Sequence, residues 1–305
     1  MVKQDIKNIF NFHNLNTGKI KKINIGFTND IYQIDEKYIL KIYKNQENEL
    51  NFEKEYFFLK SFSTKTPVPK VVSAGFDKNI IDKKYLILEK VKGVNLYQKW
   101  DLLDDIQRKN LIKQITNILK HINSEPLSGF IKKFNFSKVS WMRENESDFY
   151  KILLEIEKNK ILTFTELRNI REFIGKNIHF LKDEKQALVY WDIHFDNFLI
   201  DESNNISAIL DFEAVDIYSI DFVLDMVYKI KENPLKFATE EVEEKIDIEN
   251  YQKIDLWFKE FYPELFDFDN LDKRLKLYAL KYDLNLLLKF PKSVELKEKI
   301  LKNII

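Results

Sequence analysis

Short apolar and β-branched runs between turn-forming residues dominate the first third of the chain. Three of these runs predict strands separated by Gly26, Asn29-Asp30 and Asp35-Glu36, namely Ile20–Ile25, Ile31–Ile34 and Tyr38–Tyr43. From about Glu47 to Phe62 the apolar residues recur at helical spacing, which predicts a helix. Two more strand-like runs follow the break at Thr66–Pro69. They are Lys70–Ala74 and Lys84–Glu89, with Gly75-Phe76-Asp77 between them.

The pattern changes after Gly93, where amphipathic helices take over. Helical spacing of apolar residues predicts helices at about 102–122, 164–181, 221–231, 248–261, 271–288 and 294–304, and Ala187–Leu210 predicts two short strands around a loop. The simplest interpretation is an α+β protein with two lobes. Residues 1–91 would form a small β-rich lobe, and residues 92–305 a larger, mostly helical lobe.

Composition narrows the classes of function. Lysine plus arginine total 49 and aspartate plus glutamate total 49, so the chain lacks the basic excess typical of a nucleic-acid-binding protein. It contains no cysteine, which excludes disulfides, thiolate zinc sites and cysteine nucleophiles. The sequence shows neither a signal peptide nor a run long enough to span a membrane. We therefore expect a cytoplasmic protein without membrane or nucleic-acid partners.

The segment from Val189 to Ile200 carries the strongest chemical signal. A strand-like run ends in a polar loop that contains Asp192-Ile193-His194-Phe195-Asp196-Asn197. The five-residue separation of Asp192 and Asn197 is that of the aspartate and asparagine in a kinase catalytic loop. In such a loop the carboxylate accepts the proton of an attacking hydroxyl, and the amide oxygen holds a metal ion beside the phosphates. We predict that Asp192 is catalytic, that Asn197 is a metal ligand, and that His194 anchors the loop.

Two further positions fit this chemistry. Asp211 lies in Asp211-Phe212-Glu213, and a hairpin turn at Asn204-Asn205 would return it to the Asp192–Asn197 loop. A second carboxylate there suits Mg²⁺, which prefers oxygen ligands. Lys41 ends a strand-like run and could contact the phosphates of a nucleotide. Its partner on the following helix would be Glu55 or, as the weaker candidate, Glu53.

Two weaker signals concern the nucleotide. The stretch Gly26-Phe27-Thr28-Asn29 lies between the first two strands, where a loop covering the phosphates would be expected. Gly26, Thr28 and Asn29 are therefore predicted to contact the nucleotide. Glu89 and Val91 lie where the connection between the lobes would offer backbone groups to the base. Each residue by itself has an ordinary structural explanation, and it is their joint order along the chain that indicates function.

Together these residues resemble the aminoglycoside phosphotransferase and choline kinase family. The resemblance spans roughly residues 20–225. It is carried by Gly26–Asn29, Lys41, Glu55, Leu86–Glu89 with Gly93, Asp192–Asn197 and Asp211–Glu213. It implies a bilobal protein-kinase-like fold, Mg²⁺ as cofactor, and ATP or GTP as phosphoryl donor. It also implies that Asp221 or Asp225 braces the catalytic loop. The chain departs from the family at Tyr190, where the family usually has histidine, and at Trp191, which replaces a small residue.

The resulting hypothesis is transfer of the γ-phosphoryl group to a hydroxyl of a small molecule. In the resembling family the acceptor is bound by the helical part, here about residues 95–180 and 230–305. Aminoglycosides, choline, homoserine and sugars are all candidates, and the acidic run of Glu240, Glu241, Glu243 and Glu244 could attract a cationic one. The alternatives are a pseudokinase that only binds nucleotide and a metal-dependent phosphohydrolase that uses Asp192, His194 and Asp196.

Overall fold

The computed structural model describes residues 3–23, 29–44, 49–62, 66–77, 80–136, 139–237 and 246–304. The chain forms two compact units, each built from several segments. The first unit comprises Met1–Ile118, Asp192–Val215 and Pro234–Asn250, and the second comprises Leu119–Trp191, Asp216–Asn233 and Tyr251–Ile305. The lobe boundary near residue 91 stays a prediction. Among the described residues, no helix is long and apolar enough to cross a membrane.

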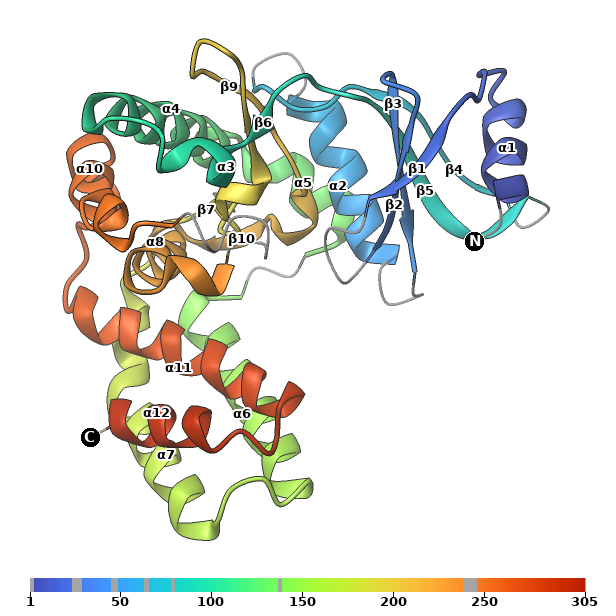
Figure 1. The fold of residues 1–305 in the computed structure, drawn as a ribbon. Coiled ribbons are helices and arrows are strands. Elements are labelled where there is room, and N and C mark those ends of the chain that lie inside the picture. The colour runs from blue at the N-terminus through green and yellow to red at the C-terminus, as the bar shows by residue number, and fades with distance from the viewer. Residues whose placement is uncertain are drawn as a thin grey trace. The chain divides into compact units, whose positions relative to one another are not determined.

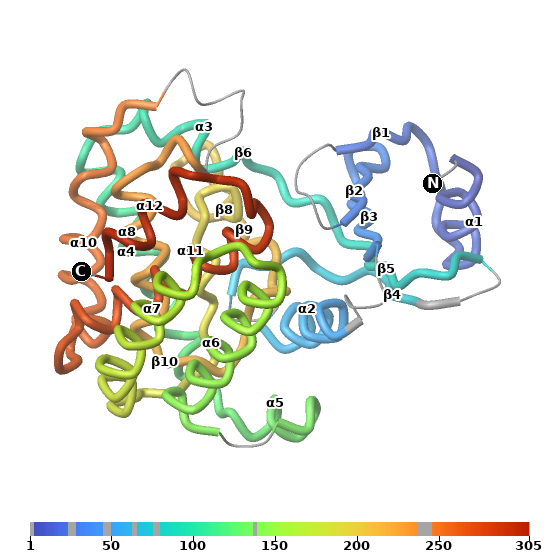
Figure 2. The backbone as a smooth tube through the Cα atoms, turned by 90° about the horizontal axis from the view of Figure 1, so that it is seen from below, coloured from blue at the N-terminus to red at the C-terminus, as the bar shows by residue number. Residues whose placement is uncertain are grey.

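A five-stranded antiparallel sheet forms the centre of the first unit. Its order is β1-β2-β3-β5-β4, with bounds Ile20–Ile23, Asn29–Ile34, Tyr38–Tyr43, Ile81–Glu89 and Val71–Asp77 in that order. Helix α1 (Lys3–Phe12) lies on one side of this sheet and α2 (Glu49–Phe62) on the other (Figure 1). Figure 2 shows α2 beside β4 and β5.

The two faces of this sheet follow from the alternation of side chains along a strand. On β3, Leu40 and Ile42 point to the face covered by α1 and join a cluster of buried apolar side chains from that helix and the sheet. Lys41 and Tyr43 point to the opposite face, where both contact Glu55 of α2. The period of two along β3 therefore turns one lysine toward α2 and away from the apolar cluster.

The first unit also contains a small antiparallel sheet of order β6-β8-β9 (Val94–Asn95, Phe198–Ile200 and Ile206–Ile209). The predicted hairpin is present between β8 and β9. Asp201 accepts hydrogen bonds at 2.9 Å from the backbone N–H groups of Ser203 and Asn205, and Asn204 has a left-handed φ of 59°. Gly93 precedes β6 at φ 144°, and a Cβ there would lie 2.9 Å from the Ile200 carbonyl oxygen, so this position requires glycine.

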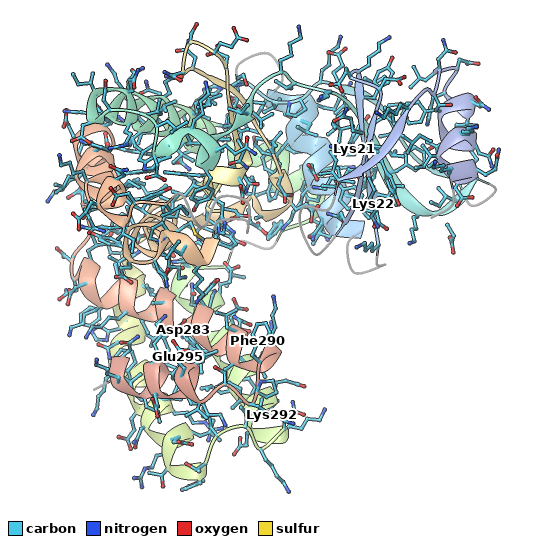
Figure 3. The ribbon with its side chains drawn as sticks, viewed as in Figure 1. Lys21, Lys22, Asp283, Phe290, Lys292 and Glu295 are labelled. Carbon is cyan, nitrogen blue, oxygen red and sulfur yellow. The ribbon has the colours of Figure 1, made fainter. Side chains whose placement is uncertain are left out.

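The second unit is mostly helical. Strands β7 (Gln186–Val189) and β10 (Asp216–Ser219) pair antiparallel, and the helices lying wholly in this unit are α5 (Leu127–Phe134), α6 (Trp141–Lys158), α7 (Phe164–Asn177), α8 (Val223–Glu232), α10 (Ile254–Phe261), α11 (Leu271–Lys289) and α12 (Val294–Asn303). Helices α6, α7, α11 and α12 bury a common apolar core. Asp283 lies on the side of α11 that faces α12 (Figure 3), where it accepts a hydrogen bond from Lys299 at 2.9 Å.

Several predicted elements differ from those observed. The long helix expected at about 102–122 is preceded by α3 (Leu96–Trp100) and runs as α4 (Asp105–Ser124). The segment Gly75-Phe76-Asp77 continues β4 and does not form a turn. Helices α1, α5 and α6 are not among the predicted elements, and the region 187–210 contains three strands where two were expected.

Candidate active site

Lys41 lies at the centre of the charged cluster in the first unit. Its Nζ is 2.7 Å from Glu55 Oε2, 3.0 Å from Asp211 Oδ1 and 2.7 Å from Glu213 Oε1, and its side chain is only 7% exposed. Burial alone would lower the pKa of Lys41, but the carboxylates of Glu55 and Asp211 raise it well above the usual value. The lysine is therefore held charged inside the protein.

Glu55 is the helix partner of Lys41, and the alternative at Glu53 is wrong. Glu55 Oε2 accepts hydrogen bonds from Lys41 and from the Tyr43 hydroxyl, whereas Glu53 pairs with Lys84 at 3.1 Å. Burial raises the pKa of Glu55 to about 7, and the charge of Lys41 opposes this shift. A carboxylate so deeply buried is stabilised as an anion mainly by its lysine.

The loop that begins at Asp192 is fixed by its own backbone and by one aromatic anchor. Residues Phe195–Asn197 form a 3-10 turn in which the Asn197 N–H bonds to the His194 carbonyl at 2.9 Å. Phe195 is buried against Trp100, with the ring centroids 4.6 Å apart. The Asn197 side-chain N–H donates to the backbone carbonyl of Asp192 at 2.9 Å, which leaves its amide oxygen directed away from that bond.

Asp192 has an unusual electrostatic environment. Burial raises the pKa of Asp192 to about 7, the negative charge of Asp211 adds to the increase, and a hydrogen bond from Asn197 opposes it. His194 Nε2 lies 3.4 Å from Asp192 Oδ1, and both side chains are 26% exposed. A carboxylate that titrates near neutral pH can take up a proton during a reaction.

The β8–β9 hairpin brings Asp211 back to this loop. The backbone N–H of Leu210 donates to the Asn197 carbonyl at 2.8 Å, so Asp211 follows directly after the residue bonded to the loop. Asp211 has a left-handed φ of 58°, and its side chain is 42% exposed. The carboxylate oxygens of Glu55, Asp211 and Glu213 lie within 4.8 Å of one another, a spacing that could hold a metal ion.

Glu213 and Asn95 are site candidates that the sequence did not predict. Glu213 ends the Asp-Phe-Glu motif. No function was predicted for it, because the aspartate is the residue of that motif with a chemical role. Asn95 donates its side-chain N–H to the Asp196 carboxylate and accepts a hydrogen bond from the Tyr97 N–H at 2.8 Å. Its position two residues after Gly93, just before an apolar helix, is a helix-capping signal that could have identified it.

The structure describes only some of the residues that were predicted to contact the nucleotide. Gly26 and Thr28 lie outside the described residues. Asn29 was expected in a loop, but it is the first residue of β2 and its side chain donates to Glu213. Glu89 ends β5, and its N–H already bonds to the Lys70 carbonyl at 2.9 Å. Val91 follows that strand without regular structure. The acidic run Glu240–Glu244 also lies outside the described residues.

The two candidate bracing aspartates have partners within the second unit. Asp221 and Arg274 form an ion pair at 2.7 Å in which both side chains are 0% exposed. Asp225 accepts a hydrogen bond from Lys229, one turn further along α8. In the same unit, Trp191 packs against Phe222 with ring centroids 5.6 Å apart.

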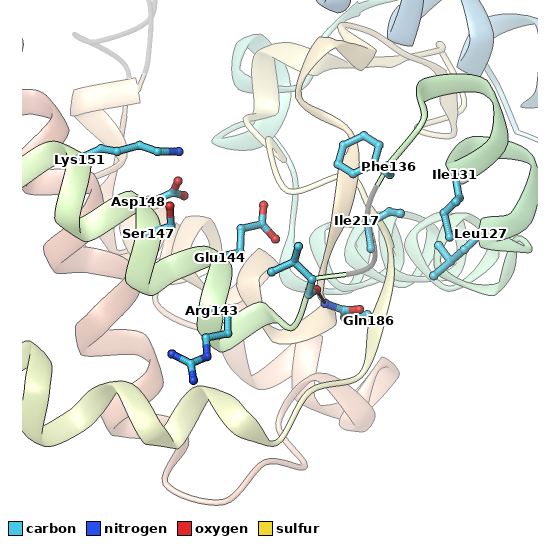
Figure 4. A pocket seen from close by; sticks show the side chains of 11 residues that line it. Leu127, Ile131, Phe136, Arg143, Glu144, Ser147, Asp148, Lys151, Gln186 and Ile217 are labelled. Atoms are coloured by element: carbon cyan, nitrogen blue, oxygen red, sulfur yellow. Dashed lines mark hydrogen bonds between the residues drawn. The ribbon is translucent and has the colours of Figure 1, made fainter.

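The second unit contains a cavity of about 300 Å³ between α5 and α6. Leu127 and Ile131 line it from α5, whereas Glu144 and Asp148 project into it from α6 (Figure 4). Asp148 also pairs with Lys281 at 3.0 Å. The cavity thus has one apolar wall and one wall that carries charges of both signs.

Comparison with known proteins identifies the class. The sequence profile of the phosphotransferase enzyme family (APH) matches residues 19–224. No curated protein sequence matches the chain. The fold is similar to that of APH(2")-IIa in its gentamicin complex, with a TM-score of 0.73 and 16% identity over 100% of this chain and 96% of that one.

Two further structures show the same similarity. ADP-bound aminoglycoside phosphotransferase APH(2'')-Ib has a TM-score of 0.71 and 16% identity over 100% of this chain and 97% of that one. The GDP complex of aminoglycoside 2'-phosphotransferase-IIIa has a TM-score of 0.69 and 14% identity over 99% and 95%. The protein is thus a kinase-like phosphotransferase with the protein-kinase-like fold. The chain belongs to the phosphotransferase enzyme family, as its motifs predicted.

Proposed function

We propose that this protein transfers the γ-phosphoryl group of ATP or GTP to a hydroxyl of a small molecule. The observation that carries the proposal is Lys41, which is bonded at once to Glu55 and to Asp211. A buried ammonium fixed by a helix glutamate, with a second carboxylate beside it, is the arrangement with which kinases hold the phosphates and their metal ion.

Asn197 and Asp211 would hold Mg²⁺. These two oxygen donors fit the ion. Asp211 offers a half-exposed carboxylate. The side-chain N–H of Asn197 bonds to Asp192, so the amide oxygen of Asn197 can bind a cation. When bound, Mg²⁺ supplies positive charge that neutralises the phosphate oxygens. The cluster otherwise has more carboxylates than cations, so nucleotide binding should depend on the metal.

Asp192 would act on the acceptor. Its carboxylate positions the attacking hydroxyl and takes up its proton, while the hydroxyl oxygen bonds to the γ-phosphorus and the bond to the nucleoside diphosphate breaks. A pKa of about 7 suits a group that must be ionised before the reaction and protonated after it. Asn95, through its bond to Asp196, would help to keep this loop in place.

Nucleotide recognition is assigned to backbone groups in the first unit. The N–H of Glu89 already bonds to Lys70, so we propose that its carbonyl oxygen binds the base. The backbone N–H of Val91 is proposed to bind the base as well. Gly26 and Thr28 are proposed to cover the phosphates. A cytoplasmic location, the absence of a nucleic-acid partner and the lobe boundary at residue 91 also remain proposals from the sequence.

The acceptor is proposed to bind to the helical part expected from the sequence, about residues 95–180 and 230–305, which includes α5 and α6. Glu144 and Asp148 could receive amino groups, and Leu127 and Ile131 could contact the apolar face of a sugar ring. A cationic, hydroxylated molecule such as an aminoglycoside or a choline-like alcohol fits this chemistry. The gentamicin complex of a structurally similar protein supports testing aminoglycosides first.

Thermal unfolding in the presence of nucleotides tests the proposal. ATP or GTP with Mg²⁺, at about 100 times its Kd, should stabilise the protein by about 2.7 kcal/mol, and removing Mg²⁺ should weaken the binding. Nucleotide consumption should then be screened across aminoglycosides and small alcohols with both donors. If neither nucleotide shifts the melting temperature, the phosphotransferase proposal is wrong. Binding without turnover on any acceptor would indicate a pseudokinase, and hydrolysis of phosphate esters without nucleotide would indicate a phosphohydrolase.

A further inference from the structure

We propose that Glu213 is an internal substitute for phosphate, which fills the anion site of the nucleotide-free protein and must leave it before a nucleotide binds. The proposal rests on the proposed function, because it concerns the same lysine. It assigns a role to a residue for which the sequence predicted none.

Three donors converge on the Glu213 carboxylate. Lys41 Nζ lies 2.7 Å from Oε1, the Asn29 side-chain N–H donates to the same oxygen, and the Asn51 side-chain N–H donates to Oε2 at 3.3 Å. These donors come from three consecutive elements, β2, β3 and α2, whereas Glu213 lies 162 residues beyond Asn51. One ammonium and two amide groups around a single anionic group form an anion-binding site, and its present occupant is a side chain of the same protein.

Carboxylates crowd the Lys41 ammonium. Three of them lie within 3.0 Å of Nζ, those of Glu55 and Asp211 as hydrogen-bond acceptors and that of Glu213 as an ion pair. The Lys41 side chain is 7% exposed, so a phosphate oxygen cannot approach from an unoccupied side. Phosphate binding to Lys41 therefore requires that one of the three carboxylates move away.

Glu213 is the carboxylate whose departure leaves the best site. Glu55 is buried on α2 and is held additionally by the Tyr43 hydroxyl, and Asp211 is needed as the metal ligand. When Glu213 leaves, the amide donors of Asn29 and Asn51 remain beside Lys41. Those donors can bind a phosphate oxygen as they now bind a carboxylate oxygen, because both acceptors are anionic.

The test compares Glu213→Gln with the wild-type protein in EDTA. The probes are ADP and inorganic pyrophosphate, which carries the phosphate charge without a base. Removing the competing charge while keeping the side-chain size should lower the Kd of both probes by about tenfold, and high salt should reduce the difference. Glu53→Gln is the matched control, because it also removes a glutamate charge beside a lysine, Lys84, at 3.1 Å, and its Kd values should be unchanged.

Three outcomes would overturn the proposal. Equal or weaker binding of both probes by Glu213→Gln in EDTA would show that Glu213 does not compete with phosphate. Weakening seen only with Mg²⁺ would show that Glu213 is a metal ligand. If the Kd also fell tenfold for Glu53→Gln, the effect would come from the change in net charge and not from the anion site. If Glu213→Gln does not fold, Glu213→Ala carries the same expectation.

The proposed function fails separately. It is wrong if the wild-type protein binds no nucleotide with Mg²⁺, and in that case a gain for Glu213→Gln with pyrophosphate alone would still identify the anion site. If the wild type binds nucleotide and Glu213→Gln shows no gain, only the role of Glu213 is lost. If no variant binds any probe, both proposals are wrong.

Discussion

Replacing Asp192 by asparagine should slow the reaction and stabilise the protein at the same time. The pKa of Asp192 is raised from 3.8 to about 7, first by burial and then by the charge of Asp211. Three pKa units correspond to about 4 kcal/mol for ionising this carboxyl in the folded protein. The side chain is 26% exposed, so we expect solvent screening to reduce the effect to about 2 kcal/mol.

The pH dependence follows from the direction of the shift. The folded pKa lies above the unfolded value, so the folded state favours the protonated carboxyl. Wild-type stability therefore falls, relative to Asp192→Asn, as the pH rises from about 4 to about 7, and the difference stays constant above that range. At pH 8 the nucleotide-free variant should melt several degrees higher than the wild type, and below about pH 4 the two should be equal.

The assay is thermal unfolding of nucleotide-free protein at several pH values, together with single-turnover rates. The rate of Asp192→Asn should fall by about 100-fold or more, the usual effect of losing a positioned general base. Asp82→Asn serves as the control, because Asp82 is exposed on β5 and its replacement should change neither quantity. A variant no more stable than the wild type at pH 8, or one with full turnover, would refute the reasoning.

The remaining predictions concern the metal ligand and the core of the second unit. Asp211→Asn should lose Mg²⁺-dependent nucleotide binding in titrations with and without the metal, whereas Asp192→Asn should keep it. The reverse result would exchange the two roles. Arg274→Met leaves Asp221 buried without its cation, and chemical denaturation should show a loss of about 3 to 5 kcal/mol. Arg171→Gln removes a half-exposed pair and should cost less than about 1 kcal/mol, and equal losses would contradict the assigned role of burial.

The charged groups that the proposed function requires in this site are unfavourable for the stability of the protein. Four carboxylates, those of Glu55, Asp192, Asp211 and Glu213, lie in the first unit around or near a single buried lysine. Such an arrangement is unfavourable at Glu55 and Asp192, where burial disfavours ionisation and raises the pKa of each carboxyl to about 7. It becomes favourable when a divalent cation neutralises part of the charge, which explains why nucleotide and metal are expected to bind together.

Some elements were predicted wrongly because their sequence pattern is short or fits two kinds of secondary structure. Helix α1 has Ile6, Ile9 and Phe10 at helical spacing, but over ten residues this pattern also resembles polar and apolar alternation. β4 continues through Gly75-Phe76-Asp77, since pairing with β5 overrides the local turn preference of these residues. In each of these segments a neighbouring element decided the structure.

Local features of the sequence were sufficient for the parts of the site that depend on spacing along the chain. The strand Tyr38–Tyr43, the five-residue separation of Asp192 and Asn197, and the hairpin before Asp211 all follow from periodicity and turn residues. The pair of Lys41 and Glu55 could be proposed because a strand and the next helix are close in the chain, although only the structure excluded Glu53. Short-range geometry fixes these features.

Only the tertiary structure decided which groups meet across long stretches of chain. Asn29 and Glu213 are 184 residues apart, and no periodicity in either segment indicates that they form a hydrogen bond. The same holds for Asn95 and Asp196, which are 101 residues apart. These contacts arise because packing of the two sheets and α2 brings separate segments to one point. A sequence can specify such a meeting point, but it becomes visible only when the chain has folded.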